Sequence, residues 1–170
     1  NNFSADRVNR ALPDAWSFAT PEEALHARSH SAEQALQRLG VTPPNDDMLH
    51  VMQSAVMAIA SHGRGLFSAN RALPPEGVPL RDLWQWCTTV REHRGDSHVA
   101  ALAVLGISGL EATVLLAIEQ GIDLEMFEES RGWHHDHMSR TVERLVKIGL
   151  LESRDRLSDA GRKLRVEVED

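Results

Sequence analysis

Three cationic or ionisable side chains share a helical phase with a row of apolar residues. The sequence predicts one long helix over residues 79–105, and on it Arg91, Arg94 and His98 fall on the same stripe as the apolar positions. Those apolar positions are Leu80, Leu83, Trp84, Cys87, Ala101, Leu102 and Leu105. The stripe is therefore expected to be buried, with cationic groups inside it.

Buried guanidinium groups need partners, because an unpaired buried charge is very costly. One interpretation is an internal salt-bridge network, with Asp14 or Glu111 as the acid. The other is a binding site for a small anionic ligand, since arginine holds carboxylate and phosphate through paired hydrogen bonds. A helix break at Gly95 would change which residues share one face of the helix. Both interpretations would then lose their premise.

A second set of charged residues lies on the outward face of a helix predicted from about His134 to Ile148. That face carries Asp136, Arg140, Glu143, Arg144 and Lys147. If the helix reads duplex DNA, Arg140 and Arg144 would contact base edges or phosphates, and Lys147 a phosphate. The same residues also form two pairs with the acid four positions before the base, which is typical of a solvated helix face.

Other candidate chemistry is weak. His134, His135 and His137 could place two imidazoles on one metal ion, but further ligands are missing, and we expect no metal site. Cys87 falls on the apolar stripe and is expected to be an inert buried residue. The sequence has no glycine-rich phosphate loop and no nucleophile elbow, so it indicates no cofactor and does not identify catalytic residues.

Helix-start signals indicate the elements that must position these residues. Thr20 and Glu23 form a capping box around Pro21, and Ser108 and Glu111 form another. Further helices are predicted after Asn45, after Asp123 and after Ser158, and a tight two-stranded turn lies between Leu150 and Leu157. Helices therefore dominate the prediction, with one small hairpin near the end of the chain.

Composition agrees with a helical fold. The chain of 170 residues is rich in helix-forming residues, and aromatic residues make up only 5% of it. The net charge of −7 argues against a generally basic nucleic-acid-binding protein, but residues 131–165 contain nine Arg or Lys against five acids. One cysteine favours a reducing, cytoplasmic location, and no apolar run approaches the ~20 residues that cross a bilayer.

The order of three helices, a tight hairpin and a closing helix is that of a winged helix. The segments Arg144–Leu151 and Leu157–Leu164 resemble the MarR family of winged helix-turn-helix regulators. That resemblance implies a recognition helix ending near Gly149 and a wing whose basic tip enters the minor groove. The wing here is much shorter than in the family, and Arg154 and Arg156 are the only basic residues left to contact DNA from it.

The whole chain also resembles the actinobacterial SalK-like helix-turn-helix family. The stretches that carry this resemblance are residues 10–16, 91–98 and 131–133. The resemblance implies a regulator but supplies no catalytic residues.

These observations together predict an all-α protein with a very short β-wing. Residues 1–106 would form a helical ligand-binding and dimerisation region, and residues 107–170 a winged helix-turn-helix. The first hypothesis is a ligand-responsive, MarR-like transcriptional regulator that binds duplex DNA as a homodimer. The alternative is an enzyme or a protein that binds a small anion at Arg91, Arg94 and His98, with the winged helix used for packing or dimerisation. A protein-interaction module is a third possibility.

Overall fold

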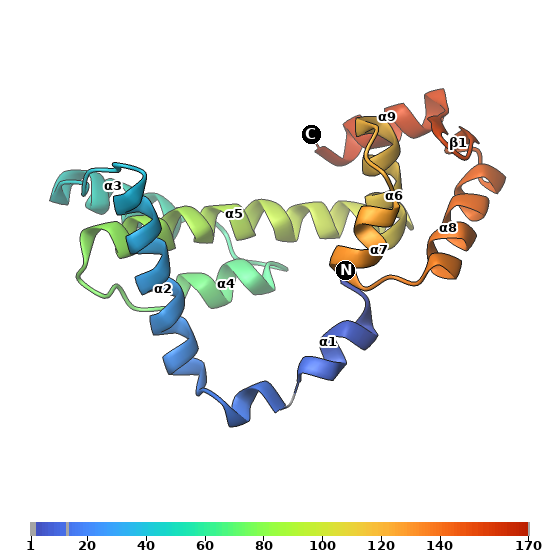
Figure 1. Cartoon of the computed structure of the whole chain (residues 1–170). Helices are drawn as coiled ribbons and strands as arrows, with labels where there is room; N and C mark the ends of the chain where they lie inside the picture. Colours follow the sequence, from blue (N-terminus) through green and yellow to red (C-terminus); the bar gives the residue numbers. More distant parts are fainter. Residues whose placement is uncertain (1–2, 13, 170) are drawn as a thin grey trace. The chain divides into compact units, whose positions relative to one another are not determined.

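The computed structural model describes residues 3–12 and 14–169, and helices dominate this part of the chain (Figure 1). The α-helices are α1 (Ala5–Ala11), α2 (Pro21–Arg38), α3 (Asp46–Ala58), α4 (Gly65–Arg71), α5 (Pro79–Val104), α6 (Gly109–Gln120), α7 (Glu125–Arg131), α8 (His135–Lys147) and α9 (Asp159–Glu169). A 3-10 turn, η1, covers Asp14–Ser17. The two strands, β1 (Leu151–Ser153) and β2 (Arg156–Leu157), pair antiparallel. The prediction of an all-α fold with a very short β-wing is confirmed.

The chain divides into two compact units. The helical unit is residues 16–97, and the winged-helix unit is the described part of residues 1–15 together with the chain from residue 98 on. Helix α5 runs from the first unit into the second. The grouping of α1 with the winged-helix unit was not indicated by the sequence.

Local capping explains where the principal helices begin. Both predicted capping boxes are present: the Thr20 hydroxyl accepts from the N–H of Glu23, and the Ser108 hydroxyl from the N–H of Glu111. In each box the glutamate carboxylate accepts the N–H of the capping residue in return. Each box satisfies N–H groups that have no partner inside the helix, so these starts are fixed by sequence alone.

The core of the winged-helix unit lies between α6, α8, α9 and the hairpin. Its buried side chains include Leu102, Ile107, Val114, Leu115, Met138, Val142, Leu145, Leu151, Leu157 and Val168. The hairpin is held against α9 because the N–H of Ser158 donates to the carbonyl of Leu150 at 3.1 Å. Gly161 packs directly on that carbonyl: a Cβ at this position would lie 2.1 Å from the Leu150 oxygen. A glycine is therefore required there.

Helix α1 is attached to the turn of the helix-turn-helix. The N–H of Ser4 donates to the carbonyl of Arg131 at 3.1 Å, and the Arg7 guanidinium donates to the carbonyl of Glu129 at 2.9 Å. Gly132 ends α7 in the left-handed region, with φ of 73°, and a Cβ there would lie 2.9 Å from Arg7. Glycine at 132 thus serves both the helix end and the close approach of α1.

The helical unit has a much smaller apolar core. Its buried cluster is Val56, Phe67 and Trp86, with Met52 and Ile59 packed against it. In the described residues, no single helix is long and apolar enough to span a membrane; the bent pair of α5 and α6 reaches that length and composition only when taken together.

Candidate nucleic-acid interface

Helix α8 turns one face to the core and the opposite face to solvent. Met138, Val142 and Leu145 are buried, as the sequence predicted. The outward face carries the exposed side chains Asp136, Arg140, Glu143, Arg144 and Lys147. The predicted candidate DNA-contacting residues therefore share one exposed surface.

The acid–base pairs expected for a purely solvated face are not formed. Within the described chain, no ion pair joins Asp136 to Arg140 or Glu143 to Lys147. Arg140 instead donates its Nε–H to the carbonyl oxygen of Asp136 at 3.1 Å. The charges of Arg140 and Lys147 thus remain available to an external anion such as a phosphate.

Arg144 is held differently from its neighbours. Its Nε donates to Oε1 of Glu111 at 2.5 Å, and Oε2 of Glu111 accepts the N–H of Ser108 at 2.7 Å. The Glu111 side chain is only 6% exposed, whereas that of Arg144 is 57% exposed. Burial raises the pKa of Glu111, but the hydrogen bonds from Ser108 and Arg144 outweigh it, and the net pKa lies below its ordinary value. Arg144 thereby joins α8 to the start of α6 while still presenting its guanidinium to solvent.

The wing supplies a smaller basic surface. Arg154 is exposed in the two-residue turn between β1 and β2. Arg156 pairs with Glu152 at 2.6 Å, with its side chain still largely exposed. The wing can therefore contribute Arg154 directly, and Arg156 once it exchanges Glu152 for a phosphate.

The histidines at the start of α8 have other contacts. Nδ1 of His135 lies 3.1 Å from Oε1 of Glu128, and the rings of His134 and His137 meet edge to face at 5.9 Å. Among the residues the structure describes, no group of three or more His, Cys, Asp or Glu side chains is arranged to hold a metal ion.

The prediction that Arg91 and Arg94 lie in a buried stripe of α5 is wrong, although Leu80 and Leu102 of that stripe are buried and the helix is continuous through Gly95 as assumed. Arg91 is 75% exposed and pairs with the adjacent Glu92, and Arg94 is exposed as well. Cys87, predicted to be buried, is exposed. An anion site at Arg91, Arg94 and the half-buried His98 would be an open surface site, and Glu111, one of the proposed partners, is bound to Arg144 instead.

The buried face of α5 in the helical unit follows different residues. Asp82, Trp86 and Thr89 are buried. The ring of His93 meets Phe67 edge to face at 5.0 Å, and Asp96 accepts the N–H of Phe67 at 2.9 Å. The face of α5 that contacts α4 is therefore partly polar, and the α4 backbone satisfies Asp96.

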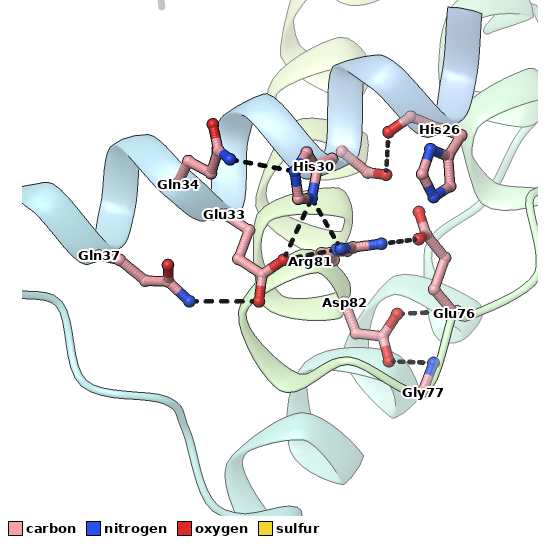
Figure 2. A network of polar contacts seen from close by, with 10 residues as sticks. His26, His30, Glu33, Gln34, Gln37, Glu76, Gly77, Arg81 and Asp82 are labelled. Carbon is pink, nitrogen blue, oxygen red and sulfur yellow. Dashed lines mark hydrogen bonds and ion pairs between the residues drawn. The ribbon is translucent and has the colours of Figure 1, made fainter. Parts of the chain in front are cut away.

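Sequence reasoning missed a cluster of charged residues at the start of α5 (Figure 2). The Arg81 guanidinium donates to Glu33 of α2 at 2.7 Å, to Glu76 at 3.0 Å and to Nδ1 of His30 at 3.0 Å. Glu33 and His30 lie about fifty positions away in the sequence, so no spacing motif joins them to Arg81. The alternation of acids and bases on α2 was the only signal of a polar contact face.

Comparison with known proteins gives one match. A family model described as a helix-turn-helix family matches residues 1–170. No curated protein and no solved structure matches the chain. The match covers both units, including the α7–turn–α8 segment whose outward face is described above. The chain therefore belongs to this helix-turn-helix family.

Proposed function

We propose that this protein is a transcriptional regulator of MarR-like type that binds duplex DNA through α8 and the wing. Family membership supports DNA binding in general. The observation that carries the proposal is the outward face of α8, where Arg140 and Lys147 have no acidic partner in the described chain. Basic side chains left unpaired on a helix of this motif are suited to phosphate and base contacts.

Each basic residue has a distinct role in this proposal. Arg140 and Arg144 reach base edges or phosphates from α8, and Lys147 contacts a phosphate near its end. Arg154 and Arg156 contact the backbone beside the wing. Glu111 holds Arg144 by its Nε, which leaves the terminal nitrogens of the guanidinium free for an anion.

We further propose that the protein acts as a homodimer and responds to a ligand bound in the helical unit. Several large apolar side chains of this unit are exposed, and its buried cluster is small. They include Phe18, Leu39, Met48, Val51, Met57 and Leu66. A second copy of the chain would cover such a surface, and sedimentation equilibrium tests it directly.

The test of DNA binding is a titration of labelled random-sequence duplex at several salt concentrations. Affinity should fall linearly with salt on logarithmic axes, because each phosphate contact releases bound counterions. Lys147→Ala should lower the slope by about one, and Arg140→Ala should weaken binding at every salt concentration. Arg38→Ala is the matched control, since this exposed arginine ends α2 in the helical unit.

Two outcomes decide against the proposal. One is the absence of salt-dependent binding at micromolar protein and low salt. The other is an equal loss of affinity in Arg38→Ala and Arg140→Ala, which would show attraction without a defined interface. Either would favour the alternatives, in which the winged helix serves packing, dimerisation or protein contacts.

A further inference from the structure

The helical unit contains a cavity of about 350 Å³ between α2, the start of α5 and the segment that joins α4 to α5. This volume is within the range of small-molecule sites in proteins. Leu25, Leu73 and Pro74 give it an apolar wall. Polar side chains, among them His26, Ser29 and Glu76, line the rest. The cavity lining thus combines apolar and polar side chains, as a site for an amphipathic molecule requires.

The carboxylate of Asp82, which lines the cavity, is engaged by backbone N–H groups of the loop before α5. Asp82 is buried, and its two oxygens accept the N–H groups of Glu76 and Gly77 at 2.7 and 3.0 Å. These bonds fix the loop before α5, as Figure 2 shows. Asp82 therefore contributes negative charge to the cavity, but it is buried and each of its oxygens already accepts a backbone N–H.

Glu76, unlike the buried Asp82, is accessible to a ligand. Its side chain is 37% exposed, and only its Oε2 accepts from Arg81. A hydrogen bond from Ser29 lowers the pKa of Glu76 most, and Arg81 lowers it further against the effect of burial. Figure 2 shows the His26 ring turned toward this carboxylate. Glu76 is thus an ionised, accessible acceptor in the lining of the cavity.

The positive charges near Glu76 do not neutralise its carboxylate. One guanidinium, that of Arg81, is shared between Glu33 and Glu76. The neighbouring His30 contacts the same guanidinium, with its Nδ1 3.0 Å from Arg81. Arg28, which also lines the cavity, lies over the Trp84 ring and bonds Gln85. Acids outnumber bases around the cavity, and its potential favours a cation.

We propose that this cavity binds an organic amine. The ammonium group would donate to the Glu76 carboxylate beside His26, and the apolar part would lie against Leu25, Leu73 and Pro74. The binding itself does not depend on DNA recognition. If the protein is the regulator proposed above, the amine is its effector.

The proposal is tested by calorimetric titration of the full chain with phenethylamine, tryptamine and hexylamine in the absence of DNA. Phenylpropionate, indolepropionate and heptanoate serve as anionic counterparts with similar apolar parts. At least one amine should bind saturably with a Kd in the millimolar range or below, and its counterpart should bind at least about tenfold more weakly.

Two variants locate the site. Glu76→Gln removes the charge and should weaken amine binding about tenfold or more. Glu167→Gln, the same change at an exposed position of α9, should leave it unchanged. Since Glu76→Gln also weakens the contact with Arg81, Leu25→Trp provides a second test: it fills the cavity without touching the charged cluster and should abolish binding. Val51→Trp, on the exposed face of α3, is its control.

Three results would overturn the proposal. They are the absence of saturable binding by all three amines, tighter binding of the carboxylates, and amine binding that survives both Glu76→Gln and Leu25→Trp. DNA titrations of the same preparations separate this outcome from failure of the regulator proposal. If the protein binds no amine but keeps its salt-dependent binding to DNA, only the amine-binding proposal is refuted.

Discussion

Nε of Arg144 in α8 lies 2.5 Å from Oε1 of Glu111, a buried residue in the first turn of α6. Glu111 also closes the capping box with Ser108, so one carboxylate fixes the start of α6 and orients α8, the helix proposed above to contact DNA. This arrangement couples the stability of the winged helix to a residue on its outward surface.

Arg144→Ala should therefore destabilise the protein as well as weaken DNA binding. Removing the partner of a buried carboxylate costs more than an exposed ion pair, but the exposure of Arg144 reduces the effect, and we expect a loss of about 1–2 kcal/mol. Arg140→Ala is the control and should change the unfolding free energy by no more than about 0.5 kcal/mol. Urea unfolding measures both. Equal stability of the two variants would show that the Glu111 contact contributes nothing.

The lowered pKa of Glu111 predicts a pH dependence. A carboxyl whose pKa is depressed in the folded state stabilises the protein above its ordinary pKa, and that contribution is lost as the pH falls through the folded value. The advantage of the wild type over Glu111→Gln should be constant from neutral pH to about pH 5 and shrink below about pH 4.5. Unfolding curves of both proteins over this range test it. A difference that is independent of pH would contradict the assigned ionisation.

Gly161→Ala and Gly95→Ala should have opposite effects although both sites are helical. At Gly161 the added Cβ would meet the Leu150 carbonyl at 2.1 Å, so the hairpin or α9 must shift, at a cost of about 1–3 kcal/mol or more. At Gly95 the nearest atom to an added Cβ is in the Glu92 side chain at 3.6 Å, and alanine should stabilise α5 by about 0.5–1 kcal/mol. Thermal unfolding of both variants shows whether the signs differ.

The sequence was a good guide where local chemistry decides the structure. Capping boxes at Thr20 and Ser108 and the glycine after α8 involve residues within one turn of one another, and the helices begin and end close to the predicted places. The apolar pattern of α8 likewise predicted its buried face, because Met138, Val142 and Leu145 all point to one core.

The buried face of α5 could not be predicted in the same way. Its apolar residues suggested a stripe through Cys87, yet the helix turns His93 and Asp96 toward Phe67 of α4 and buries Thr89. His93 and Asp96 find their partner in Phe67, which lies on another helix, whereas the Thr89 hydroxyl donates to the carbonyl of Gln85 in α5 itself. Similarly, the partners of Arg81 lie on α2 and the loop before α5, which no spacing in the sequence connects.

Finally, the attachment of α2 should depend on Arg81. Within the described part of α2 only Ser29 is buried, so few apolar contacts hold this helix, whereas Arg81 bonds both Glu33 and His30 on it. Arg81→Met keeps the apolar stem of the side chain but removes these bonds, and it should raise amide hydrogen exchange in α2 roughly tenfold. Arg91→Met, at an exposed position of the same α5, should leave exchange in α2 unchanged. Mass spectrometry of peptides from residues 21–38 gives the answer. If α2 exchanges at the same rate in both variants, apolar contacts rather than the Arg81 cluster hold it in place.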